Sequence, residues 1–154
     1  MLPIQRILAP TDFSEPSYRG VKAADELAGH FGAELLVIHV VSSSQFVPPA
    51  GPPVPTGYQL STLLEELMDA ARQSIRRTIE EKVSKDVSTR SFVLSGAPAD
   101  EIVRVAAEEK VDAIVIATHG WTGWRRFIFG SIAEKVVRLA QCPVLTIPGG
   151  EDEE

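Results

Sequence analysis

Cysteine is nearly absent from this sequence of 154 residues, in which Cys142 stands alone. One cysteine excludes an internal disulfide and a CxxC pair, and the three histidines show no metal-ligand spacing, so we expect no dedicated metal site. Long hydrophobic runs are lacking too, because the longest clean ones, residues 35–38 and 113–117, are far shorter than the ~20 residues of a membrane span. No apolar segment typical of a secretory signal precedes Asp12. We therefore expect a cytoplasmic protein with no membrane partner.

A surplus of positive charge is missing as well. Lysine and arginine number 15 against 21 acidic residues, the net charge is −6, and the last four residues supply much of it. With no basic field to hold a phosphate backbone, nucleic acid is not expected as a partner. The hydrophobic share of 44% is typical of a globular protein, and the length fits one domain. We expect that domain over residues 1–148 and an acidic disordered tail over residues 149–154.

Two kinds of segment alternate along the domain. Short segments rich in Val, Ile and Leu, typical of strands covered on both faces, lie at residues 6–9, 35–41, 92–94, 113–117 and 144–147. Stretches with helical spacing of apolar residues lie between them, at residues 16–31, 60–83, 99–109 and 132–140. This alternation predicts an open, doubly wound, five-stranded α/β sheet.

Residues 42–58 interrupt that alternation. They hold five of the eleven prolines, with Gly51 and Gly57 and three serines, so we expect neither helix nor strand there. We interpret the segment as a Pro-rich flexible loop that leaves the second strand. The alternative is a docking ligand in polyproline II form.

Two strand ends are candidates for a binding site, because ligands of open α/β sheets bind at the carboxyl ends of strands. The first is Ala9-Pro10-Thr11-Asp12, and the second runs from Ile116 through Gly120 to Gly130-Ser131, where the last predicted helix begins. A helix N-terminus with nearby glycines favours phosphate. Two structural alternatives need no ligand: Ser131 to Glu134 also fits a capping box, and Asp12 also fits an Asx-type turn.

The second candidate carries a recognisable spacing. Ala117 is followed after two residues by Gly120, and after nine more by Gly130-Ser131. With the flanking residues 6–14 and 131–147, this resembles the G-x2-G-x9-G-[ST] loop of the ATP-binding branch of universal stress proteins, over about residues 3–148. The resemblance implies a Rossmann-like parallel sheet of strand order 3-2-1-4-5, with helices on both faces. It also implies ATP as the ligand, with Mg²⁺ carried on the phosphates, and a homodimer through the last strand, residues 144–147.

The resemblance also implies a role for each matching residue. The nucleoside end would be lined by Pro10, Thr11 and Asp12, and the adenine edge would meet backbone groups of Val40. The ribose and first phosphate would contact Ala117, Thr118, His119 and Gly120, and the outer phosphates Gly130, Ser131 and Ile132. Ala117 replaces the first glycine of the family pattern, which is harmless if the backbone is extended there and costly if φ is positive.

The sequence also bears on turnover. It holds no GxxxxGK[ST] loop, and no paired carboxylates or lysine in a motif suited to in-line phosphoryl transfer. We therefore predict an ATP-binding regulatory module of the stress response with little or no turnover and no catalytic residue. Two alternatives stay open: a weak ATP hydrolase or phosphotransferase that uses Asp12 with a bound metal, and a nucleotide-free dimeric interaction module.

Overall fold

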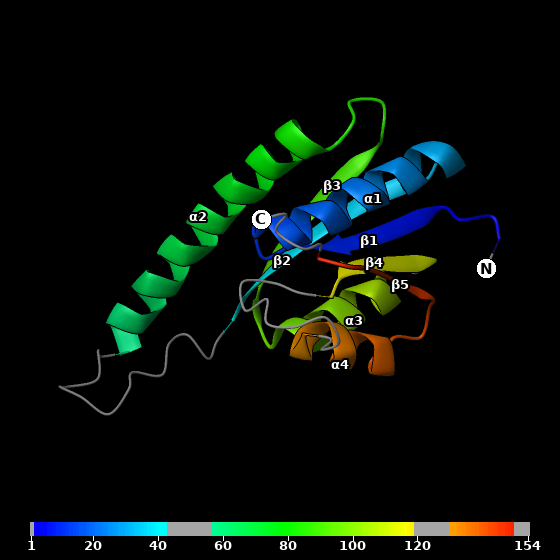
Figure 1. Cartoon of the computed structure of the whole chain (residues 1–154). Coiled ribbons are helices and arrows are strands. Elements are labelled where there is room, and N and C mark those ends of the chain that lie inside the picture. The colour runs from blue at the N-terminus through cyan, green and yellow to red at the C-terminus, as the bar shows by residue number, and fades with distance from the viewer. Residues whose placement is uncertain (1, 43–56, 119–129, 150–154) are drawn as a thin grey trace, which may run out of the picture.

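Strands and helices alternate throughout the computed structural model, which describes residues 2–42, 57–118 and 130–149 (Figure 1). The strands are β1 (Arg6–Pro10), β2 (Glu34–Ser42), β3 (Thr89–Gly96), β4 (Ala113–Ala117) and β5 (Val144–Ile147). The helices are α1 (Glu15–Phe31), α2 (Gly57–Lys82), α3 (Pro98–Glu108) and α4 (Ser131–Leu139). The predicted bounds 42–58 of the Pro-rich loop were too wide at both ends, because Ser42 still belongs to β2 and Gly57 already begins α2. The rest of that prediction, residues 43–56, lies outside the described residues.

The five strands form one sheet in the order β3-β2-β1-β4-β5, and every pairing is parallel. This confirms the predicted architecture and strand order. β1 lies in the middle, with Leu8 opposite Leu36 of β2 on one side and opposite Ile114 of β4 on the other. The carboxyl ends of β1 and β4 are therefore neighbours, and both predicted candidates for a site meet at one edge of the sheet.

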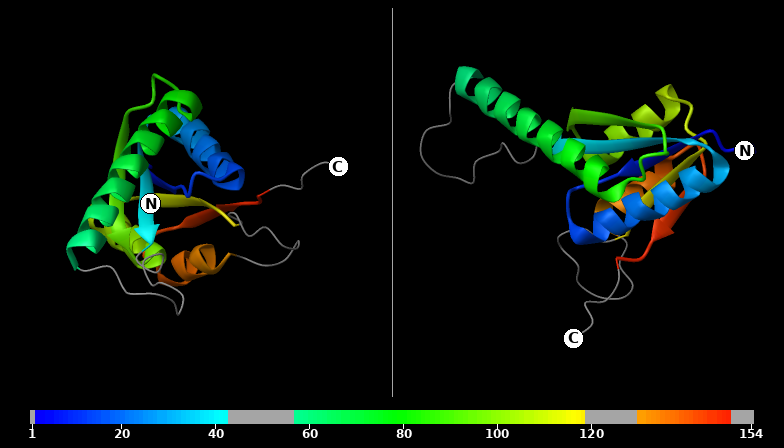
Figure 2. Two further views of the ribbon diagram at one scale, coloured as in Figure 1. Left: turned by 90° about the vertical axis from the view of Figure 1, so that its left-hand side faces the viewer. Right: turned by 90° about the horizontal axis from the view of Figure 1, so that it is seen from above.

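Side chains that alternate along the strands build two separate apolar layers. Leu8, Leu36 and Ile114 pack on one face with Ile102 of α3 and Val136 of α4. On the other face α1 and α2 cover the sheet, as Figure 2 shows, through a layer made of Ile7, Ala9, Val21, Ala24, Leu35, Val37, Ile75 and Val115. The prediction of helices on both faces of the sheet is thus confirmed. Because both faces are covered, the sequences of the central strands are continuous apolar runs.

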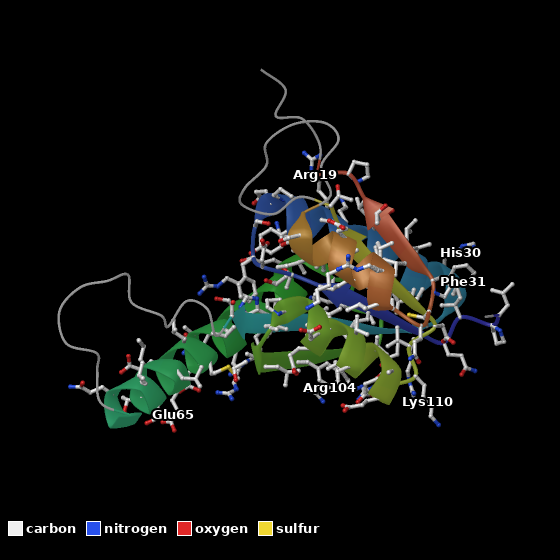
Figure 3. All side chains as sticks on the ribbon, turned by 90° about the horizontal axis from the view of Figure 1, so that it is seen from below. Arg19, His30, Phe31, Glu65, Arg104 and Lys110 are labelled. Atoms are coloured by element: carbon white, nitrogen blue, oxygen red, sulfur yellow. The ribbon has the colours of Figure 1, made fainter. Side chains whose placement is uncertain are left out.

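Helix α2 is longer than the sheet it covers. Ala71, Ile75 and Thr78, in its second half, are buried, whereas its first turns project past the end of the sheet (Figures 1 and 2). Figure 3 shows Glu65 on this projecting part. In the described part of the chain, no helix combines the length and apolar character that crossing a membrane requires.

Candidate functional site

A cavity of about 270 Å³ opens at the carboxyl ends of β1 and β4. Every predicted site residue that the structure describes lines it: Pro10, Thr11, Asp12, Val40, Ala117, Thr118, Gly130, Ser131 and Ile132. The remaining two, His119 and Gly120, lie outside the described residues. Residues 10–12 therefore meet residues 117, 118 and 130–132, more than 100 positions further along the chain, around one hollow.

The cavity also has a wall that the sequence analysis did not anticipate. It includes Ser17 of α1, His39 of β2, Pro98 and Ile102 of α3 and Ala133 of α4. Pro98 and Ile102 belong to the start of α3, which packs beside α4. Asp100 of α3 forms an ion pair with Lys135 of α4 at 2.9 Å. No sequence motif marks α3 as a neighbour of the α4 start, because that proximity follows from the strand order alone.

The turn between β1 and α1 is held by its own short polar side chains. The Thr11 amide donates to the Ile38 carbonyl at 2.9 Å, and the Thr11 hydroxyl lies 2.9 Å from the Ser17 hydroxyl. The Asp12 carboxylate accepts from the Ser14 amide at 3.0 Å and from the Ser14 hydroxyl. Asp12 thus forms the Asx-type turn while it lines the cavity, so the two interpretations of this residue are compatible.

Phe13 stands in the left-handed region, with φ of 65°, in this same turn. Its amide donates to the Thr11 hydroxyl at 3.0 Å, and its ring stacks on His39 with centroids 4.3 Å apart. His39 Nδ1 lies 2.8 Å from the Thr11 carbonyl oxygen. Burial lowers the pKa of His39, so the ring is neutral at pH 7, and Nδ1 carries the proton that it donates to that carbonyl.

The other side of the cavity is the start of α4. The Gly130 amide donates to the Thr118 carbonyl at 2.6 Å, and the Gly130 carbonyl accepts from the Glu134 amide at 3.0 Å. A Cβ atom at Gly130 would lie 3.0 Å from the Thr118 carbonyl oxygen. The φ of Gly130 is −55°, so glycine is favoured here by the close approach of two backbones and not by its conformation.

The N-cap of α4 is Gly130, and Ser131 is the first helical residue. The capping-box alternative is therefore wrong, since that box needs Ser131 at the N-cap, and no side chain in the described part of the chain caps this helix. The first turn of α4 lines the cavity with Ser131, Ile132 and Ala133. Backbone N–H groups and the positive end of the helix dipole thus lie at the cavity, an arrangement that favours an anion.

Ala117, the departure from the family pattern, is the last residue of β4 and is extended. Its side chain lies toward α1, because a Cβ built at Gly20 would be 3.7 Å from the Ala117 Cβ and 3.2 Å from its amide nitrogen. The methyl group therefore costs nothing in backbone conformation, as expected for an extended residue.

Comparison with known proteins gives relatives over nearly the whole chain. Universal stress protein MJ0531 of Methanocaldococcus jannaschii is 39% identical over 144 residues, which cover 93% of this chain and 81% of that protein. The solved structure of MJ0577 from the same organism matches with a TM-score of 0.79 at 24% identity, covering 97% of this chain and 99% of that one. A universal stress protein from Archaeoglobus fulgidus, solved in complex with dAMP, matches with a TM-score of 0.55 at 23% identity over 96% and 99% of the two chains.

The family model of the universal stress proteins matches residues 3–148. These residues contain all five strands, all four helices and the whole described wall of the cavity. The chain therefore belongs to the universal stress protein family.

Proposed function

We propose that this chain binds ATP, with Mg²⁺ carried on the phosphates, as a regulatory module of the stress response with little or no turnover. The observation that carries the proposal is the cavity itself, in which an apolar slot adjoins a helix N-terminus that no side chain of the described residues caps. A flat base fits the first and phosphate fits the second. One relative of this fold was solved with dAMP, so adenine nucleotides are the class to test.

The slot would take the base. Ile102 and Ile116 are nearly fully buried, and Val40 is the last of the apolar residues of β2 that face the cavity. Adenine buries apolar area against such side chains, and the main chain of Val40 would meet its edge. Asp12, at the end of β1, would then face the ribose or the base.

The phosphates would lie at the α4 start, on the amides of Ser131 and Ile132 and on the Ser131 hydroxyl. Gly130, whose own amide is bound to the Thr118 carbonyl, would let them approach the backbone closely. Asp12 is the one carboxylate that lines the described part of the cavity, and it belongs to the opposite wall, at β1. Mg²⁺ carried on the phosphates needs no protein ligand at α4, and no acidic side chain of the described residues lines the phosphate end as a candidate general base. This supports binding over hydrolysis.

A pair of variants at one position tests where the phosphates bind. Ser131→Glu adds a negative charge at the first residue of α4, where the positive end of the helix dipole stabilises it. Ser131→Gln adds a side chain of the same size without the charge. A like charge ~4 Å from a phosphate costs about 4 kcal/mol near a protein surface. In calorimetric titrations, Ser131→Glu should bind ATP about tenfold or more weakly than Ser131→Gln, should lose less affinity for AMP, and should bind adenosine equally well.

Gln73→Glu, on the exposed side of α2, makes the same charge change away from the cavity and is the matched control. Equal binding of ATP to both Ser131 variants would contradict the placement of the phosphates. Absence of binding to the wild type at millimolar nucleotide would favour the nucleotide-free interaction module. Steady release of ADP would favour the hydrolase.

We further propose that two copies pair through β5. This strand is an edge of the sheet, and Leu145 on it and Val137 on the preceding helix are 46% and 45% exposed. Pro143 and Pro148 bound the strand and limit the paired stretch to Val144–Ile147. An apolar edge of this kind is a template for another strand.

Light scattering at micromolar concentration should give the mass of a dimer. Leu145→Asp should give a monomer, because it buries a charge in the pairing face. Leu63→Asp, at a residue of α2 with 43% exposure, is the matched control and should leave the dimer intact. A monomeric wild type would refute the pairing.

A further inference from the structure

We infer that His39 is a positioning residue of the nucleotide site, which acts by holding the turn that carries Asp12. The inference rests on the proposed function. Its basis is that the His39 ring binds both neighbours of Asp12: Nδ1 donates to the Thr11 carbonyl, and the ring face stacks on Phe13. The residue before Asp12 and the residue after it are thus fixed by one side chain.

The turn needs such support because it is strained. Phe13 has φ of 65°, in the left-handed region that residues other than glycine rarely adopt. The conformation lets Thr11 and Asp12 line the cavity while α1 begins at Glu15. Outliers of this kind persist only where their surroundings hold them, and they gather at functional sites.

The contacts that hold Phe13 come from two directions. Its amide is bound to the Thr11 hydroxyl at 3.0 Å, and its ring lies on His39 at 4.3 Å with an interplanar angle of 29°. The imidazole, in turn, is fixed by the 2.8 Å hydrogen bond to the Thr11 carbonyl. Removal of the ring therefore takes away the hydrogen bond on one side of Asp12 and the stack on the other.

His39 also connects the two walls of the nucleoside end. It precedes Val40 in β2, and its hydrogen bond reaches across to the end of β1. The Thr11 amide makes the reciprocal connection to the Ile38 carbonyl at 2.9 Å. The separation between the Val40 main chain and the Asp12 carboxylate is therefore set by contacts in which His39 takes part.

Three substitutions of His39 distinguish the effect of its hydrogen bond from the effect of its side-chain volume. His39→Asn keeps an amide N–H close to the place of Nδ1, His39→Gln carries its amide one bond further out, and His39→Leu keeps apolar volume alone. We expect the ATP dissociation constant to rise about five- to tenfold in His39→Leu and in His39→Gln, as for loss of one hydrogen bond. His39→Asn should stay within about threefold of the wild type. If His39→Leu does not fold, the Asn and Gln variants carry the comparison.

A double-mutant cycle tests whether His39 acts through Asp12. Asp12→Asn keeps the oxygen that accepts from Ser14 but removes the charge. If His39 positions that carboxylate, His39→Leu should change the ATP affinity of the Asp12→Asn protein by less than about twofold, whereas groups that do not interact give additive effects. In a Ser131→Ala protein, altered at the other end of the cavity, His39→Leu should keep its full effect.

The outcomes separate this inference from the proposed function. A wild type that binds no ATP overturns both. A wild type that binds ATP, with His39→Leu binding it equally well, overturns only the role of His39. So does a penalty that persists unchanged in the Asp12→Asn protein, or one that His39→Asn fails to relieve, because a merely structural role would give either result.

Discussion

Replacement of Gly130 by alanine tests the close approach at the start of α4. The new Cβ would lie 3.0 Å from the Thr118 carbonyl oxygen, against 3.4–4 Å for an ordinary contact, so about 0.4 Å must be gained. Thr118 is poorly placed to yield, since its amide donates to the Ile147 carbonyl at 3.0 Å and its carbonyl already accepts from Gly130. Overpacking of this kind costs about 1–3 kcal/mol.

The conformation itself favours the substitution. With φ of −55°, alanine is allowed at position 130, and the loss of glycine's freedom in the unfolded chain returns about 0.4–1 kcal/mol. The net loss should therefore be about 1 kcal/mol, or roughly 2–4 °C in Tm for a chain of this length. The ATP affinity should fall with it, because the shifted backbone carries the proposed phosphate amides.

Gly57→Ala provides the control, because a Cβ at Gly57 meets nothing within 4 Å. It gains the same entropic term without the contact, so the difference between the two variants isolates the contact. Urea unfolding should place Gly130→Ala about 1–3 kcal/mol below Gly57→Ala. If the free energies of unfolding of the two variants agree within about 0.5 kcal/mol, the steric explanation of Gly130 is refuted.

Two further predictions follow from the same geometry. Ala117→Gly should leave the ATP affinity unchanged, since Ala117 is extended and its methyl lies toward Gly20, but should lower the free energy of unfolding by about 0.5–1 kcal/mol; a marked gain in affinity by calorimetry would contradict this. Burial lowers the pKa of His39, so the unfolded chain takes up a proton near the ordinary value of 6.5 while the folded chain takes it up only at lower pH. The free energy of unfolding should therefore fall as the pH drops below about 6.5, and urea titrations of His39→Asn should lack that part of the slope.

The helix-covered sheet could be predicted because the central strands are unmistakable, whereas the strand order was implied by the family resemblance. Residues 35–41 and 113–117 are apolar on both faces, and such runs fit only a sheet covered by helices. The third strand was predicted too short, as residues 92–94, because β3 is an edge: its first residues, including Arg90 and Ser91, are exposed and carry no apolar signal.

The candidate site was predictable where it lies at strand ends and not where it depends on packing. Pro10–Asp12 and residues 117–118 lie at the ends of apolar segments, and the rule for parallel sheets brings such ends together. Gly130–Ile132 were predicted from the glycine spacing before the last helix. No sequence motif around His39 or Pro98 indicates that these residues line a site. The capping box failed because the hydrogen bond from the Gly130 amide to Thr118 fixes the helix start one residue earlier than that box requires.

The central place of β1 also shapes how the chain folds as it is made. β1 is synthesised before the other four strands of this sheet, and β2 pairs with one of its edges soon afterwards, but the other edge belongs to β4. The Asp112 carboxylate, which closes that edge on the Arg6 amide at 2.9 Å, lies 106 residues further along the chain. At ~5–20 residues per second, an apolar strand edge therefore stays open on the nascent chain for roughly 5–20 s. During that interval the open edge is a template for intermolecular pairing.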